Sequence, residues 1–359
     1  MNRISKTTRS NSLTYAGVIA AFIILQIMTG TGSISSSLKG QLVPICAYVV
    51  MAISLNLTVG ISGELSLGHA GFMSVGAFSG VVAAMSLQQA IPLAPLRLAV
   101  SMVVAGIFAG FAGVLVGIPV LRLKGDYLAI VTLAFGEIIK SIVNNLYVGV
   151  DGGGLHFAML KNANSLGLEE GGKVIINGPM GISGITKIST FTAGFVLILF
   201  TLFIVFNLVK SRTGRAIMAI RDNRIAAESV GIGVTKYKLI AFVTSAVLAG
   251  MAGALFAMNY STIVASKFDF NTSILILVFV VLGGLGNMWG SIIAATVLTI
   301  LPEALRSFSD YRMLVYSIVL IIVMLATNNP LIKNFLGDIR NRLFKPKRNK
   351  KLEGGGTNE

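Results

Sequence analysis

Ten continuous apolar runs dominate this 359-residue sequence, and each is close to the length of a helix that crosses a bilayer. Such a helix needs about 20 consecutive apolar residues. Membrane strands would instead show short segments of alternating polarity. We therefore predict an all-α, polytopic transmembrane helical bundle with about ten spans. The runs cover residues 13–31, 42–60, 66–87, 96–118, 127–146, 191–210, 239–260, 272–286, 289–305 and 313–328.

Two features leave part of this count open. The run at 272–286 is short and shares a glycine-rich turn with the run that follows it, and the run at 66–87 can also be read as broken or partly re-entrant. The composition supports a lipid environment: only 12% of the residues are charged, against roughly 25% in an ordinary soluble domain. So few charges cannot cover a water-facing surface.

The net charge of +15 follows the predicted topology. With both termini in the cytoplasm, the cytoplasmic segments hold 20 basic residues and the outer segments hold 8. Basic residues concentrate on the cytoplasmic side of membrane proteins. A nucleic-acid surface would instead show a basic stripe, so we exclude nucleic acid as a partner. For residues 1–31, a cleaved signal peptide remains an alternative to a retained span.

The predicted domain organisation is a transmembrane domain over residues 1–332, followed by a tail over residues 333–359. The tail is basic and then glycine-rich, a composition typical of disorder. Two loops are long enough to carry more than a turn: an outer loop at 147–190 and an inner loop at 211–238. The inner loop is the most polar stretch between spans and is a candidate docking surface.

Two spans share a pattern of small residues that allows an inverted repeat. Residues 109–115 read Ala-Gly-Phe-Ala-Gly-Val-Leu, and residues 249–255 read Ala-Gly-Met-Ala-Gly-Ala-Leu. Inverted repeats are common in transporters, whereas chance similarity between two packing surfaces is the alternative. The small residues that recur along 96–118 predict close helix packing, because they let backbones approach in lipid. They are Gly106, Gly110, Gly113 and Gly117.

The inner loop predicts a short charged helix at 223–230. Asp222 or Asn223 can cap its start, and Gly231 can end it in a left-handed conformation. On the cytoplasmic surface, such a helix would suit docking to a soluble partner; an ordinary solvated loop is the alternative. The candidate docking residues are Arg221, Asp222, Arg224, Ala226, Ala227, Glu228 and Gly231.

A polar, glycine-rich break separates the second and third runs. Irregular backbone at membrane depth is tolerated where protein or a watery cavity satisfies it, so residues 56–72 are the best candidates for lining a translocation path. A cytoplasmic turn with a polar cap is the alternative. The candidate residues at this break are Asn56, Ser62, Gly63, Ser66 and His69.

Glu137 completes the candidate path residues, since a carboxylate inside a span is costly unless a cavity or counter-ion receives it. Lys140 lies one turn further along the same helical face and can pair with it. We expect a structural Glu137–Lys140 pair, and the alternative is contact between Glu137 and an amino group in the path.

We predict no catalytic, metal-binding or cofactor-binding residues. The chain has one cysteine, Cys46, and two histidines that are far apart in sequence. Residues 167–173 match the spacing of a phosphate loop, but Val174 stands where that loop needs Ser or Thr. Without a phosphate loop of its own, this chain would depend on another subunit for any ATP hydrolysis.

Several sequence blocks between about residues 50 and 325 resemble permeases of branched-chain amino acid importers of the LivM type. Ala226, Ala227 and Gly231 also keep the spacing of the coupling segment in ATP-binding-cassette permeases, although Ile225 stands where Glu is usual. The blocks that carry the resemblance are Ser66–Phe72, Leu123–Tyr127, Thr132–Glu137, Arg221–Phe242, Ala249–Leu255 and Leu282–Gly290.

This resemblance implies a non-enzymatic permease subunit in a bacterial plasma membrane. It implies a sister permease, two cytoplasmic ATP-binding subunits that meet the inner loop, and an extracytoplasmic solute-binding protein. Branched-chain amino acids are the expected cargo, and related permeases for urea and short amides are an alternative. Two other classes remain as rivals: an ion-coupled secondary transporter that uses Glu137, and a membrane-embedded enzyme, for which the spans offer no paired acid–base groups.

Overall fold

The structure, a computed structural model, describes residues 6–32, 35–123, 125–151, 154–159, 166–168 and 172–305, with isolated positions 314, 317, 318 and 321. The predicted tail at 333–359 and nearly all of the predicted span at 313–328 lie outside these residues. The chain divides into two compact units, Met1–Ala304 and Leu305–Glu359. Helices α1 to α11 and strands β1 to β5 all belong to the first unit.

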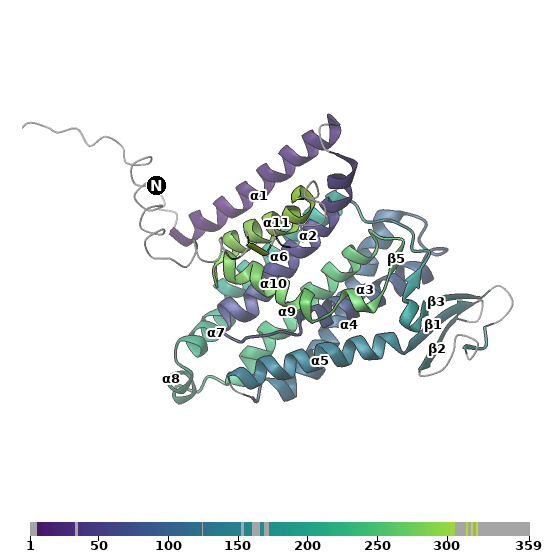
Figure 1. The fold of residues 1–359 in the computed structure, drawn as a ribbon. Coiled ribbons are helices and arrows are strands. Elements are labelled where there is room, and N and C mark those ends of the chain that lie inside the picture. Colours follow the sequence, from purple (N-terminus) through teal and green to yellow (C-terminus); the bar gives the residue numbers. More distant parts are fainter. Residues whose placement is uncertain are drawn as a thin grey trace, which may run out of the picture. The chain divides into compact units, whose positions relative to one another are not determined.

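Long helices make up most of the first unit (Figure 1). In chain order they are α1 (Lys6–Gly30), α2 (Ser36–Asn56), α3 (His69–Ser86), α4 (Ala94–Val120), α5 (Asp126–Asn144), α6 (Phe191–Lys210), α7 (Arg212–Asp222), α8 (Arg224–Ser229), α9 (Val234–Ala257), α10 (Phe270–Gly283) and α11 (Met288–Ala304). A π-helical turn, η1 (Leu57–Ile61), continues α2. Two short 3₁₀ turns, η3 (Gly178–Met180) and η4 (Ala265–Lys267), lie in loops.

The prediction of about ten spans was too high. Among the described residues, seven helices are long and apolar enough to cross a membrane: Ser36–Ile61, His69–Ser86, Ala94–Val120, Tyr127–Asn144, Phe191–Lys210, Val234–Ala257 and Ala265–Gly283. The apolar helices Thr14–Gly30 and Met288–Ala304 are shorter. At 1.5 Å per residue Met288–Ala304 is only about 25 Å long, whereas the hydrocarbon core is about 30 Å thick; Thr14–Gly30 is the apolar part of the longer helix α1.

The structure contains a small antiparallel sheet, which the prediction of an all-α fold did not include. Its strands are β1 (Leu146–Asp151), β2 (Gly154–Met159), β3 (Lys173–Asn177), β4 (Ile182–Ser183) and β5 (Thr262–Ile263), in the order β2-β1-β3-β4-β5. Four strands come from the predicted outer loop, and β5 comes from the loop after α9. In register, Val148 lies opposite Phe157 on β2 and Ile176 on β3. Apolar and β-branched residues favour such pairing.

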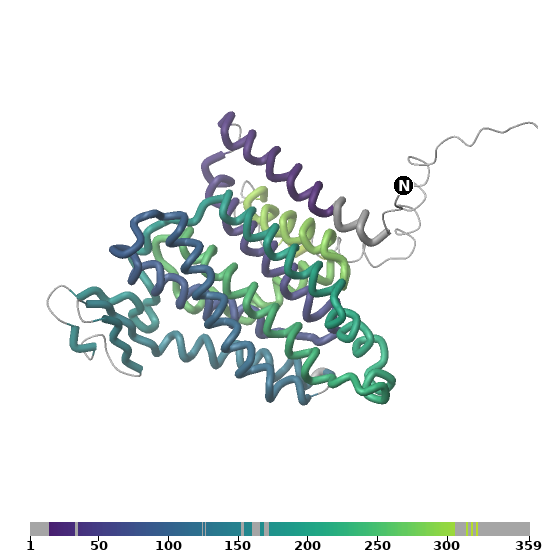
Figure 2. The backbone as a smooth tube through the Cα atoms, turned by 180° about the vertical axis from the view of Figure 1, so that it is seen from behind, coloured from purple at the N-terminus to yellow at the C-terminus, as the bar shows by residue number. Residues whose placement is uncertain are grey.

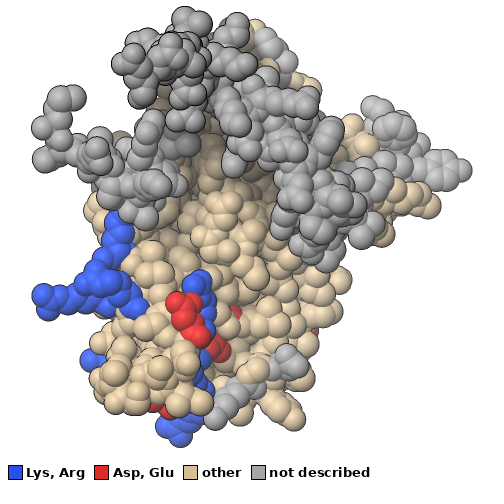
Figure 3. All heavy atoms as spheres, turned by 90° about the vertical axis from the view of Figure 1, so that its left-hand side faces the viewer, with Lys and Arg blue, Asp and Glu red and all other residues tan. Residues whose placement is uncertain are grey.

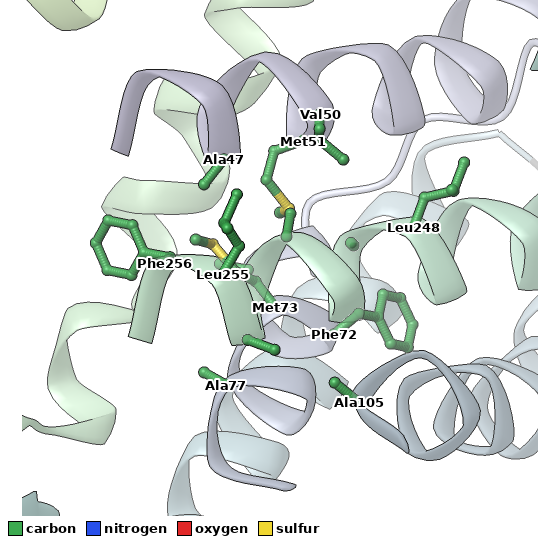
Figure 4. Close-up of a cluster of buried hydrophobic side chains, with 14 of the residues drawn as sticks. Ala47, Val50, Met51, Phe72, Met73, Ala77, Ala105, Leu248, Leu255 and Phe256 are labelled. Carbon is green, nitrogen blue, oxygen red and sulfur yellow. The ribbon is translucent and has the colours of Figure 1, made fainter. Parts of the chain in front are cut away.

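The core of the first unit lies where α9 packs against α2, α3 and α4. Figure 4 shows its centre, where Met51 of α2, Met73 of α3, Ala105 of α4 and Leu255 of α9 converge. All four side chains are almost completely buried. Small residues at the crossings allow the four helices to meet there, because in lipid helices associate mainly through close packing.

Glycines let α9 approach its neighbours. The four glycines of α4 face α9: Gly106 lies against Met251, and Gly117 lies against Leu239 and Phe242, so the prediction that they serve helix packing is confirmed. The contacts run in opposite order along the two segments, so α4 and α9 are antiparallel. The matched segments of the possible repeat also meet, since a Cβ on Gly250 would lie 2.3 Å from the Cβ of Ala109. Whether they descend from a repeat stays a prediction.

The sheet and the α7–α8 segment lie at opposite ends of the first unit (Figures 1 and 2). Helix α6 connects β4 to α7 along the chain, and its 20 residues span about 30 Å. The outer loop and the inner loop therefore lie on opposite sides, as the topology predicts. Which side faces the cytoplasm stays a prediction from the charge distribution.

The α3–α9 crossing provides a test of the packing. A Cβ on Gly76 would lie 2.1 Å from the carbonyl oxygen of Gly250, and one on Gly253 would lie 2.1 Å from that of Met73. Backbone atoms cannot move aside as the end of a flexible side chain can. We therefore expect Gly76→Val to lower the free energy of unfolding by about 1–3 kcal/mol or more. Thermal unfolding in detergent, followed by size-exclusion chromatography, measures this change.

Gly40→Ala is the matched control, because no atom lies within 4 Å of the Cβ position at Gly40 and alanine favours a helix. Equal melting temperatures for Gly76→Val and wild type would contradict the close approach of α3 and α9.

Candidate functional site

The break predicted at 56–72 is present as an interruption between α2 and α3. The π-turn Leu57–Ile61 ends α2, and residues 62–68 contain no helix before α3 begins at His69. Two glycines make this course possible. Gly63 adopts a φ of 76°, which favours glycine. At Gly60, a Cβ would lie 1.9 Å from Oδ1 of Asn56 and 2.2 Å from the backbone nitrogen of Gly286.

Asn56 connects this break to the turn between α10 and α11. Its side chain is fully buried. Its Nδ2 donates a hydrogen bond to Oγ of Ser291 at 2.9 Å, and its Oδ1 accepts one from the backbone N–H of Gly286 at 2.8 Å. The amide therefore bonds to one group within the α10–α11 turn and to one on α11.

His69 also lies buried at the break. Its Nε2 is 2.8 Å from Oγ of Ser54 on α2, which joins the last turns of α2 to the start of α3. One residue further on, the backbone N–H of Ala70 donates to Oγ of Ser273 on α10 at 3.1 Å. Three helices thus meet at the first turn of α3 through short polar side chains.

Four hydroxyl groups along residues 58–74 are buried without a hydrogen-bond partner among the described residues. They belong to Thr58, Ser62, Ser66 and Ser74. A buried hydroxyl that lacks a partner costs about 1–3 kcal/mol, so this segment favours binding of water or of a polar solute. Ser62 and Ser66 were predicted as path residues.

Glu137 lies apart from this group, where α5 meets α3 and α10. Its Oε2 is 2.5 Å from Nζ of Lys140, so the predicted ion pair is confirmed. The side chains are 44% exposed at Glu137 and 25% exposed at Lys140. Glu137 also lines a small void of about 10 Å³ with Asp269 and Ser273, a volume that suits about one water molecule. Ser273 links this site to the break through its bond to Ala70.

The short helix predicted in the inner loop is present as α8. Asn223 provides the cap, with Oδ1 accepting from the backbone N–H of Ala226 at 3.0 Å. Asp222 instead ends α7 and pairs with Arg221 at 3.0 Å. Gly231 follows α8 with a φ of 83°, the left-handed conformation predicted for it. Arg224 and Glu228 form an ion pair one turn apart at 3.0 Å.

One side of α8 is anchored and the other faces outward. Ala227 is buried beside Ile220 of α7 and Val234 of α9. On the outer side, Ile225 is 80% exposed and Val230 is 74% exposed. Figure 3 shows this end of the molecule, where basic side chains gather with acidic ones among them. Exposed apolar side chains within a charged surface are typical of contact sites for other proteins.

A cleft of about 290 Å³ separates this segment from the break. Arg221 crosses between the two regions, because its Nη1 donates to the carbonyl oxygen of Gly60 at 3.0 Å. Lys238 of α9 forms a second link, an ion pair with Glu64. The cleft is lined by Ser62, Gly63, Glu64, Leu123, Gly125, Ile220, Arg221, Arg224 and Lys238.

The sequence-predicted residues thus fall into three groups. The break contains Asn56, Ser62, Gly63, Ser66 and His69; α5 carries Glu137; and the α7–α8 segment holds the predicted docking residues. Sequence reasoning did not single out Ser54, Gly60, Glu64, Lys238, Ser273 and Ser291, which hold the break in place through hydrogen bonds and an ion pair. In the described part of the chain, no three His, Cys, Asp or Glu side chains gather as a metal site requires.

Replacing Asn56 tests the buried amide contacts. Asn56→Ala leaves the N–H of Gly286 and the hydroxyl of Ser291 without that partner, at a cost of about 1–3 kcal/mol each. We expect amide hydrogen exchange at residues 284–291 to accelerate by about tenfold or more. Asn259→Ala is the control, because the side chain of Asn259 makes an exposed bond of 3.4 Å to Gly40. Unchanged exchange in Asn56→Ala would refute the role of this amide.

Known proteins place these features in one family. The chain is 34% identical over 291 residues to the high-affinity branched-chain amino acid transport system permease protein LivM of Salmonella typhimurium and to that of Escherichia coli. These matches cover 77% of this chain and 66% of either relative, which is less than two thirds of their length.

More limited matches reach other import permeases. The ribose import permease protein RbsC of Haemophilus influenzae is 28% identical over 123 residues, which are 32% of this chain and 38% of that protein. The chain matches no solved structure. Residues 37–325, from the start of α2 to beyond α11, match the family described as branched-chain amino acid transport system / permease component. The chain therefore belongs to this family of multi-pass membrane permeases.

Proposed function

We propose that this chain is a permease subunit of an ATP-driven importer and that it moves branched-chain amino acids together with a sister permease. Family membership and the LivM relatives support the transport class and the cargo. The observation that carries the mechanism is α8, a helix anchored on one side by Ala227 that exposes Ile225 and Val230 on the other.

Helix α8 is the proposed docking site for an ATP-binding subunit. Burying an exposed Ile side chain contributes about 1.5–3 kcal/mol, so Ile225 and Val230 together can hold a partner surface. The surrounding charges of Arg224 and Glu228 would orient that partner, because polar groups at a rim set specificity. Gly231 ends α8 sharply and leaves Val230 outward-facing.

The proposed orientation places α7 and α8 in the cytoplasm. Seven basic residues lie within 210–238, and basic residues favour the cytoplasmic side. The sheet then lies on the outer side, where an extracytoplasmic solute-binding protein would deliver cargo. Two ATP-binding subunits, one for each permease, complete the proposed assembly in a bacterial plasma membrane.

The proposed path runs along the break between α2 and α3. The unpartnered hydroxyls of Thr58, Ser62, Ser66 and Ser74 would bind water or the polar end of the cargo. Among the seven candidate spans α5 has the smallest buried share, yet it carries the half-exposed Glu137–Lys140 pair. Ionised groups at membrane depth avoid lipid, so we place the sister permease, or the aqueous path between the two permeases, over this face of α5.

The docking role of α8 predicts an effect of Ile225→Asp. The side chain is exposed, so the substitution leaves the fold intact, but it puts a charge where the partner would bury an apolar group. We expect the affinity for the ATP-binding subunit to fall about tenfold or more. Co-purification with that subunit, followed by titration, measures the loss.

Met180→Asp is the matched control, since Met180 is 70% exposed but lies at the opposite end of the unit, beside the sheet. An Ile225→Asp variant that binds the ATP-binding subunit as tightly as wild type would exclude α8 as the docking site.

The transport role has its own test. We expect leucine uptake into proteoliposomes to require this chain, the sister permease, the ATP-binding subunits, the solute-binding protein and ATP. Uptake by this chain alone under an ion gradient would overturn the proposal in favour of a secondary transporter. ATP-driven uptake of urea or a short amide in place of leucine would keep the transport class and change the cargo.

A further inference from the structure

Arg221 directs its side chain toward the bundle. Its Nη1 donates to the carbonyl oxygen of Gly60 at 3.0 Å, while Nη2 and Nε bond to Oδ1 of Asp222 at 3.0 and 3.2 Å. Its aliphatic part lies against the break, because a Cβ on Gly63 would be 2.7 Å from Cγ of Arg221. A residue near the end of α7 thus contacts the end of α2, which is 161 positions away in sequence.

The contact has a clear physical cause. The last carbonyl groups of a helix lack partners within it, and the end of a helix attracts positive charge. Gly60 lies in the final turn of the π-helix. The guanidinium of Arg221 supplies both a donor and a charge to this turn. π-helical turns also occur frequently at functional sites.

The contacts of Gly60 continue into the core. A Cβ on Gly60 would clash with Oδ1 of Asn56 and with the backbone nitrogen of Gly286, so Gly60 lies directly against both atoms. Oδ1 of Asn56 accepts from that same nitrogen, and Nδ2 bonds to Ser291 on α11. A continuous set of contacts therefore leads from α7 through the π-turn to the α10–α11 turn.

A second link holds the same segment through α9, the helix that follows α8 in the chain. Glu64, four residues after Gly60, forms an ion pair with Lys238 of α9. Residues 60–64 are thus held by α7, which precedes α8, and by α9, which follows it. The cleft of about 290 Å³ beside these links provides room for the two sides to move relative to each other.

We propose that Arg221 is a positioning residue that transmits displacement of the α7–α8 segment to the π-turn at Leu57–Ile61 and, through Asn56, to the α10–α11 turn. This inference rests on the proposed transport function. It assigns Arg221 a role distinct from docking, since its guanidinium bonds to the chain's own backbone. Movement of the Gly60 carbonyl would shift the unpartnered hydroxyls of Thr58 and Ser62 on either side of it.

The first test uses the isolated chain and needs no transport. The relay requires that loss of the Arg221–Gly60 bond loosens the Asn56 contacts, so Arg221→Ala should raise amide exchange at Gly286. Arg221→Lys should restore part of the protection, because lysine can still donate to the Gly60 carbonyl. Arg215→Ala is the control: Arg215 bonds to the carbonyl of Lys210 within its own segment. Wild-type exchange at Gly286 in Arg221→Ala would overturn the relay.

The second test uses the assembled transporter in proteoliposomes, with uptake and ATP hydrolysis measured on the same samples. We expect Arg221→Ala to lower the uptake per ATP hydrolysed by about tenfold, Arg221→Lys to recover part of it, and Arg215→Ala to match wild type. A merely structural role would reduce the amount of assembled complex without changing this ratio. An unchanged ratio in Arg221→Ala, or an equal fall in Arg215→Ala, would refute the inference.

The two proposals fail in different ways. A wild-type assembly that shows no ATP-driven uptake would refute the proposed function, and the exchange experiment on Arg221→Ala would still decide whether the three segments are coupled.

Discussion

The need to satisfy backbone polar groups without water governs this structure. In lipid an unpaired N–H or C=O group costs several kcal/mol, so irregular backbone survives only where protein contacts it. The π-turn and residues 62–68 form such a segment. Their partners come from distant parts of the chain: the guanidinium of Arg221 donates to the carbonyl oxygen of Gly60, and the hydroxyl of Thr132 accepts from the N–H of Leu67 at 3.1 Å. The break persists because these side chains enclose it.

The same constraint explains why the interior is built from glycine and alanine. Helices α3, α4 and α9 must approach closely enough to gain dispersion contacts, since burial of apolar side chains away from lipid offers little. Gly76, Gly250 and Gly253 bring backbone against backbone at the α3–α9 crossing. The result is a close-packed scaffold beside the break, and polar side chains are confined to the places where the backbone departs from helix.

Sequence reasoning located the main helices, the break at 56–72 and α8 because each has a local cause. Continuous apolar runs, the glycine at 63, the cap at Asn223 and the left-handed Gly231 all act within a few residues. The partners of Asn56 lie 230 and 235 residues away, and no local pattern predicts such pairs. The run at 289–305 was taken as a full span although its helix, α11, has only 17 residues, and the sheet was missed because its strands are brief and lie in a loop rich in glycine.

The last strand pair of that sheet has a mechanical consequence. Ile182 and Ser183 pair with Ile263 and Thr262, and this pairing staples the connection that precedes α6 to the connection that follows α9. The two helices are therefore fastened together at one end, and at the other end the chain connects them through α7, α8 and the turns between them. Because α9 packs along its length against α2, α3 and α4, the strand pair ties this end of α6 to the packed core of the unit.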